Sequence, residues 1–115
     1  MSISRKNERE AIRHDYQMCR DRLLEFSQQA AALSSELGAV RHRTNVLSAE
    51  IARCSRTLPL DVPELEALHL ERRDYVMRRS LLEGTLESIA MSKQKIEAQK
   101  ERLRKELQEI EWLID

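Results

Sequence analysis

Apolar side chains recur every three or four residues along two long stretches of this sequence, with a proline-containing segment between them. The first stretch follows alternating steps of four and three residues from Ile12 to Leu58, and Thr44 is its one polar member. A 3.5-residue period sustained over about six heptads predicts a coiled-coil helix. Its predicted a and d positions are Ile12, Tyr16, Cys19, Leu23, Phe26, Ala30, Leu33, Leu37, Val40, Thr44, Leu47, Ile51, Cys54 and Leu58.

The second stretch has the same period but a different composition at its a positions. Its d positions are all apolar: Leu68, Tyr75, Leu82, Ile89, Ile96, Leu103 and Ile110. Half of its a positions are basic: Leu65, Arg72, Arg79, Leu86, Lys93, Lys100, Leu107 and Ile114. A long basic side chain at an a position can lay its stem along the seam between the helices and keep its charge in water. Such residues weaken the seam but help to fix register and oligomeric state.

The segment between the two stretches contains both prolines of the chain. Pro59 removes a backbone donor and disfavours helix at Leu58, whereas Pro63 suits the first turn of a new helix. Asp61 is a candidate N-cap residue, with Glu64 three residues later in a capping-box spacing. The sequence therefore predicts one helical hairpin over residues 1–115, with helices at about 5–57 and 64–114 and a turn at about 58–63. The predicted fold class is all-α, an antiparallel coiled-coil hairpin of two long helices.

Charge supports pairing of the two halves of the chain. Residues 1–58 carry 10 basic and 7 acidic residues, and residues 59–115 carry 10 basic and 13 acidic residues. Opposite net charges favour pairing between the halves over self-pairing of like halves. The whole chain has 20 basic and 20 acidic residues, so we expect neither nucleic acid nor an anionic membrane as a partner.

No motif in the sequence points to catalysis. The three histidines are far apart, and the two cysteines lie on one predicted helix, too far apart for a disulfide bond with each other. Buried, reduced cysteines are the first interpretation, and a bridge between two chains is the alternative. We expect no enzyme activity, no catalytic residue, no cofactor and no metal site. No apolar run is long enough for membrane insertion, and the N-terminus has no signal-peptide pattern, so we expect a cytoplasmic protein.

Some apolar residues lie outside the predicted seam and are candidates for partner binding. One group follows the turn and includes Leu70, Met77 and Leu81, and a second consists of Trp112 and Leu113 near the C-terminus. A tryptophan beside aliphatic residues at the end of a helix can serve as an anchor in a partner's pocket. The other interpretation is that Trp112 covers the end of the hairpin.

In heptad organisation and in its single break at Pro59–Pro63, the span from Ile12 to Ile114 resembles the stalk proteins of bacterial type III secretion and flagellar export, the SctO/YscO and FliJ families. The resemblance implies a hairpin that inserts into the pore of a hexameric export ATPase and contacts the export gate. It would place the helix ends near Arg9, Arg13 and Trp112 in the ATPase ring, and the turn toward the gate.

Two other functions stay open at this point. The hairpin could be a structural scaffold or tether in a larger helical assembly, because a two-helix rod buries only one narrow stripe per helix. It could instead be a small secretion chaperone that holds an amphipathic helix of its client against Leu70, Met77 and Leu81. We expect a stalk to be monomeric, a scaffold to self-associate or to fold together with its partners, and a chaperone to dimerise, so a homodimer is possible.

Overall fold

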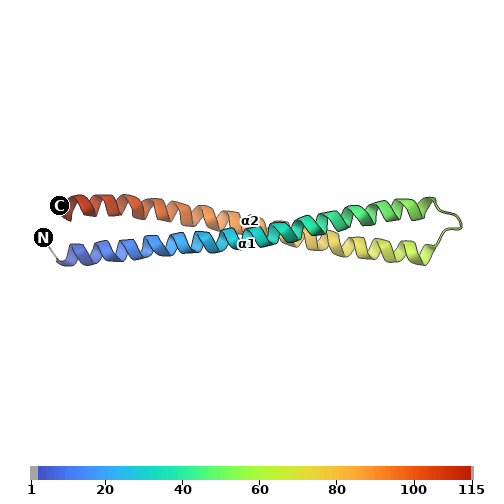
Figure 1. Ribbon diagram of the computed structural model, residues 1–115, viewed down its shortest axis with the longest axis horizontal. Helices are drawn as coiled ribbons and strands as arrows, with labels where there is room; N and C mark the ends of the chain where they lie inside the picture. Colours follow the sequence, from blue (N-terminus) through green and yellow to red (C-terminus); the bar gives the residue numbers. More distant parts are fainter. Residues whose placement is uncertain (1–2, 115) are drawn as a thin grey trace. The chain divides into compact units, whose positions relative to one another are not determined.

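The computed structural model describes residues 3–114, and the side chains of residues 3–112. Two α-helices account for nearly all of this part: α1 (Ile3–Arg56) and α2 (Val62–Ile114), with no strand among the described residues (Figure 1). Cross-helix ion pairs show that α1 and α2 run antiparallel, since partners further along α1 lie earlier along α2. The predicted all-α fold, an antiparallel hairpin of two long helices, is confirmed.

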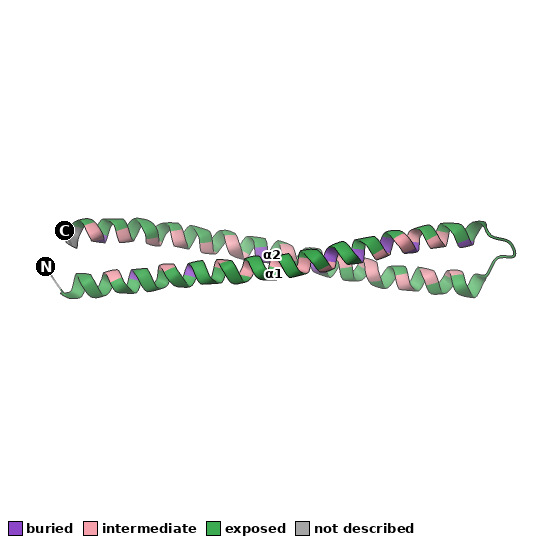
Figure 2. Cartoon of the chain, viewed as in Figure 1, coloured by how far each residue is buried: buried purple, intermediate pink, exposed green. Residues whose placement is uncertain are grey.

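Contacts divide the chain into two compact units, each built from a segment of both helices. The terminal unit comprises Met1–Gln29 and Ser88–Asp115, and the turn unit comprises Ala30–Glu87. In both units the buried and half-buried residues lie on the sides of the helices that face each other (Figure 2). This is the burial pattern expected when only one apolar stripe of each helix contacts the other helix.

The core of the turn unit consists of predicted a and d residues from both helices. Leu37, Val40 and Leu82 are buried together, and Leu33, Tyr75 and Leu86 pack against them. Nearer the turn, Leu47 is fully buried, with 0% of its surface exposed. Thr44, the polar member of the stripe, is also buried, and its Oγ1 donates a 2.9 Å hydrogen bond to the Val40 carbonyl of its own helix. The threonine is tolerated in the core because its hydroxyl has a partner there.

The terminal unit has a thinner core. Its buried residues are Ile12, Cys19, Ile89 and Ile110, again all at predicted d positions. Cys19 is free, as is Cys54 in the turn unit, and both thiols are buried. Both cysteines therefore contribute small apolar side chains to the seam, which confirms that they are buried.

The predicted stripe of α1 is buried or half-buried at every position from Ile12 to Cys54, but its last member is not. Leu58 is 86% exposed, so its assignment to the seam is wrong. The helix ends at Arg56, and the residue before Pro59 cannot easily keep a helical backbone, which carries Leu58 out of the stripe.

The turn is shorter than predicted, because α2 begins at Val62 and α1 ends at Arg56. The Asp61 carboxylate accepts a 3.0 Å hydrogen bond from the Glu64 amide, so the predicted N-cap is confirmed. The Leu65 amide donates to the Asp61 carbonyl at 3.0 Å, which starts the hydrogen-bond series of α2. Pro63 therefore lies in the first turn of the helix, where its missing amide proton costs no intrahelical bond.

The four basic a residues of α2 are more exposed than their apolar neighbours in the seam. Arg79, Lys93 and Lys100 are half-buried, and Arg72 is exposed. The Arg72 Nε donates to Ser48 Oγ across the helices at 2.8 Å. These burial levels are those expected of stems that cover the seam while the charged heads reach water.

Ion pairs link the helices on both flanks of the seam. In the terminal unit, Arg13 contacts Glu111 at 3.3 Å. In the turn unit the pairs are Arg41–Glu83 at 3.2 Å, Arg43–Glu71 at 2.9 Å and Glu36–Arg78. The hydrogen bond to Glu71 raises the pKa of the Arg43 guanidinium above its ordinary value. All of these groups are substantially exposed, so we assign the pairs a role in register more than in stability.

Candidate interaction surfaces

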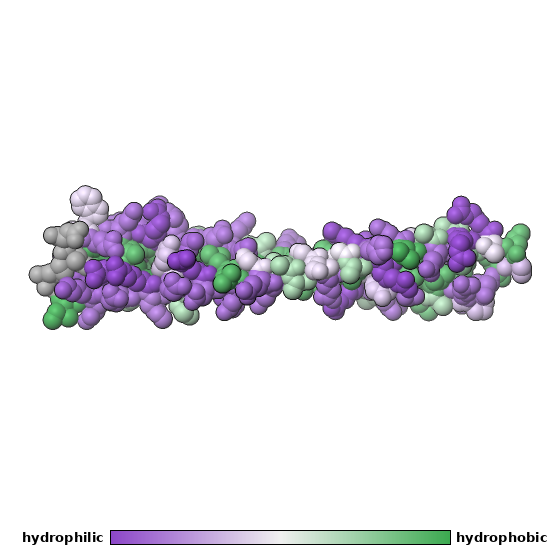
Figure 3. Space-filling view, viewed as in Figure 1, coloured by the Kyte–Doolittle hydropathy of each residue, from purple (hydrophilic) through white to green (hydrophobic). Residues whose placement is uncertain are grey.

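Residues 3–114 contain no helical stretch that is both long enough and apolar enough to span a membrane. Over the same residues, no three His, Cys, Asp or Glu side chains come together in a group that could hold a metal ion. The candidate sites are therefore surfaces. Figure 3 shows a mostly hydrophilic surface on which hydrophobic atoms emerge at intervals.

One such surface lies on α2 in the turn unit. Leu70, Met77 and Leu81 are 57%, 58% and 68% exposed, and we call these three residues the outer patch. In the heptad frame Leu70 and Met77 take f positions and Leu81 a c position, so they point away from the seam. Spacings of seven and four residues place them about 10 Å and 6 Å apart along the helix. The structure therefore places these three candidate residues on a single face.

The other two candidates lie near the end of α2, in the terminal unit. The Trp112 side chain is 85% exposed, so it does not cover the end of the hairpin, and that interpretation is wrong. The Leu113 side chain lies outside the described residues. Trp112 and the outer patch belong to different units, so they do not form one described site.

A second kind of surface, which was not predicted from the sequence, lies along the two flanks of the seam. At 100° per residue, the g and d positions of a helix are neighbours, and so are the a and e positions. In an antiparallel pair, the g positions of both helices meet on one flank, the g side, and the e positions meet on the other, the e side. Each flank therefore has a groove with a floor of seam residues. Residues at d positions form the floor on the g side, and residues at a positions form the floor on the e side.

Two hollows open on the g side of the terminal unit. The larger, of about 340 Å³, has Cys19 and Ile96 in its floor and is flanked by Asp15, Arg22 and Gln99 at g positions. Met18, which is 56% exposed, lies at its edge. The apolar floor and polar flanks are the arrangement of a groove between two paired helices.

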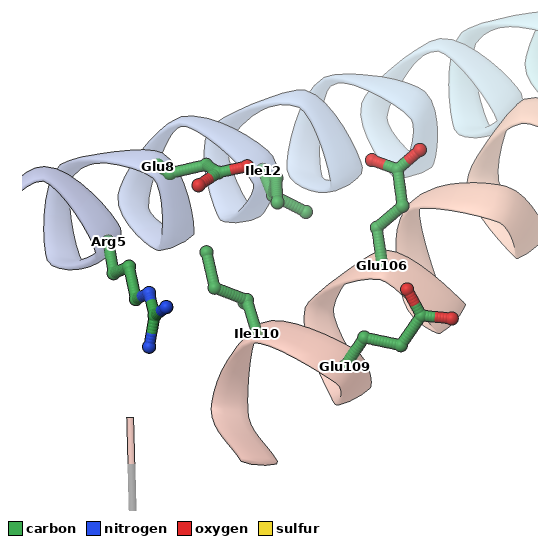
Figure 4. A pocket seen from close by; sticks show the side chains of 6 residues that line it. All are labelled: Arg5, Glu8, Ile12, Glu106, Glu109 and Ile110. Carbon is green, nitrogen blue, oxygen red and sulfur yellow. The ribbon is translucent and has the colours of Figure 1, made fainter. Parts of the chain in front are cut away.

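The smaller hollow, of about 180 Å³, lies nearer the chain ends. Figure 4 shows Ile12 from α1 and Ile110 from α2 directed into the space between the helices, with Glu8, Glu106 and Glu109 around it. Arg5 also lines this hollow. Glu8 and Glu106 occupy facing g positions, and two carboxylates cannot form a salt bridge across the seam.

The g side of the turn unit is built differently. Two of its facing g pairs have opposite charge, and Arg43–Glu71 and Glu36–Arg78 bridge the two helices there. In the terminal unit the facing g residues include Glu8 with Glu106 and Asp15 with Gln99, neither of which can form a salt bridge. The turn unit has a smaller hollow on its own g side, of about 60 Å³, next to the turn. The two units thus differ in the residue types that face each other across the g side. This difference could have been read from the sequence once the register was fixed, but the register was not known.

No family model, curated protein or solved structure matches this chain. The class that the fold itself defines is an all-α helical-hairpin protein.

Proposed function

We propose that this chain is a non-enzymatic coiled-coil interaction protein that binds other proteins through surfaces outside its own seam. The observation that carries the proposal is the outer patch, because α2 buries one apolar stripe against α1 and still exposes Leu70, Met77 and Leu81. Such a group of large apolar side chains on an outward helix face is typical of a site that a partner covers.

We further propose the particular role of a cytoplasmic stalk in a bacterial type III secretion or flagellar export apparatus, with a hexameric export ATPase and the export gate as partners. Its support is the resemblance in heptad organisation and single break, together with the antiparallel hairpin. The exposed Trp112 is then an anchor for the ATPase ring.

The stalk role is tested by adding the purified chain to the hexameric export ATPase of the same organism. We expect faster ATP hydrolysis, and we expect Trp112→Ala to reduce the gain several-fold because it removes the most exposed aromatic anchor. The control is Leu24→Ala, which removes a side chain that is 60% exposed on α1. Unchanged hydrolysis together with no binding at micromolar concentration would exclude the stalk role.

The outer patch also favours a second candidate, a small secretion chaperone that holds an amphipathic helix of its client. Met77→Asp with Leu81→Asp should then abolish client binding while the helix content, followed by circular dichroism, stays unchanged. A stalk should tolerate the same pair of changes, because its partners contact the hairpin ends. A scaffold or tether would instead be recovered with other coiled-coil proteins and without an ATPase.

A further inference from the structure

The terminal unit carries opposite charge on the two flanks of its seam. Around the g-side hollows the acidic residues are Glu8, Asp15, Glu106 and Glu109, against Arg5 and Arg22. Along the e side, counting a and e positions, the basic residues are Lys6, Arg9, Arg13, Arg20, Lys93, Lys100 and Arg104, against Glu97 and Glu111. The linings of the two hollows thus hold two more acidic than basic residues, mainly at the smaller hollow, whereas the a and e positions of the e side hold five more basic than acidic residues.

The acidic flank is also the one with an apolar floor. Ile12 and Ile110 lie under the smaller hollow, and Cys19 and Ile96 under the larger one. On the basic flank, three of the floor positions are the half-buried Arg9, Lys93 and Lys100. An apolar ligand could therefore pack against apolar side chains on the g side, whereas on the e side it would contact charged groups.

We propose that the g side of the terminal unit is a docking groove for one amphipathic helix of a partner protein, with an apolar stripe flanked by basic residues. A helix fits because the floor residues recur at the seam period, so the apolar stripe of a third helix can pack into them. Basic flanks fit because Glu8, Asp15, Glu106 and Glu109 outnumber Arg5 and Arg22 around the floor. From Glu8 to Arg22 the groove extends about 21 Å along α1, which corresponds to about four turns of the docked helix.

A second copy of this chain does not meet these requirements. Its own basic flank carries Lys93 and Lys100 where the docked helix needs apolar residues. The outer patch has an apolar surface but also carries Asp74 at the c position between Leu70 and Met77. The groove therefore selects a partner with a separate basic amphipathic helix. This inference deepens the interaction role proposed above and does not depend on the export ATPase.

The test uses the full chain and two fluorescent peptides of about 21 residues, which match the groove with a turn to spare at each end. Both peptides have three heptads with leucine at a and d, and they differ only in lysine or glutamate at e and g. Fluorescence anisotropy at physiological salt should show that the lysine peptide binds at least about tenfold more tightly. Equal binding of the two peptides, or no binding of either up to about 500 µM, a range weaker than most specific complexes, would overturn the proposal.

Reversal of charge at the acidic residues that border the groove tests whether the peptide binds there. Asp15→Lys with Glu106→Lys should weaken the lysine peptide at least about tenfold and strengthen the glutamate peptide. The matched control is Glu97→Lys on the e side, which should change the affinity less than about twofold. Circular dichroism should show unchanged helix content for all three exposed substitutions.

The outer patch provides the competing location. Met77→Asp with Leu81→Asp should leave peptide binding intact, because both residues lie in the turn unit. Loss of binding in that variant, with binding retained after charge reversal at the groove, would place the peptide on the outer patch and overturn the groove. Failure of the ATPase assay leaves these outcomes unaffected, so the two proposals fail separately.

Discussion

At the scale of single residues, the heptad position decides the environment of a side chain more strongly than its chemistry. Leu81 and Leu82 are identical neighbours, yet 68% of Leu81 and only 4% of Leu82 is exposed. The cause is the 100° rotation between successive residues, which directs Leu82 at d into the seam and Leu81 at c to water.

Leu82→Asp tests this difference directly. A carboxylate at this position lies among Leu37, Val40 and Leu86, so we expect a loss of several kcal/mol in the free energy of unfolding. Thermal melting followed by circular dichroism should lose its cooperativity. The control is Leu81→Asp, which should melt within a few degrees of the unsubstituted chain, and equal melting of both variants would show that the heptad frame is wrong.

The pKa of the exposed Glu101 carboxyl group depends on its neighbour Arg104. A hydrogen bond from Arg104 lowers the pKa of Glu101, and the positive charges of Lys105 and Lys100 act in the same direction. Because the pKa is lower in the folded chain, the stabilising contact is complete above the unfolded pKa and is lost as the pH falls through the folded one. In an NMR titration, Arg104→Gln should move the Glu101 pKa up, whereas Arg102→Gln should leave it unchanged.

At the scale of elements, the helix boundaries depend on a few residues around the turn. α1 ends with Arg53 and Arg56 in its last turn, where positive charge interacts favourably with the helix dipole. α2 begins with a side-chain cap from Asp61 and with Glu64 in its first turn. These local interactions fix where each helix stops, and the seam then aligns the two helices.

Asp61→Ala removes the cap without touching the seam. The Glu64 amide would lose its acceptor, and we expect the free energy of unfolding in urea to fall by about 1 kcal/mol. Asp61→Asn should retain most of the stability, since its side-chain oxygen can accept the same hydrogen bond. A loss of equal size in both variants would mean that the carboxylate acts through its charge and not as a cap.

At the scale of the whole molecule, the basic residues in the seam of α2 bear on its oligomeric state. Arg79 is half-buried at an a position, where an aliphatic residue would bury more apolar surface. The arginine therefore limits stability, and it also penalises alternative assemblies in which its head would be cut off from water.

Arg79→Leu should raise the melting temperature by a few degrees and promote self-association, which sedimentation equilibrium would detect as an increase in mass. The matched control is Arg73→Leu, the same chemical change at an exposed b position. A lower melting temperature for Arg79→Leu alone would show that the arginine stabilises the hairpin.

The sequence by itself determined the elements of this protein. The heptad period predicted both helices and nearly every buried residue, and Asp61 and the two prolines predicted the turn, because these signals act between residues a few positions apart. Leu58 was misplaced because the stripe continued in the sequence beyond the point where Pro59 ends the helix.

Only the tertiary structure decided which residues face each other across the seam. The pairing of Glu8 with Glu106, of Asp15 with Gln99 and of Arg43 with Glu71 depends on the register of α1 against α2. Register is a relation between residues up to about a hundred positions apart, which periodicity within one helix does not contain. The groove of the terminal unit and the ion pairs across the g side of the turn unit follow from that relation.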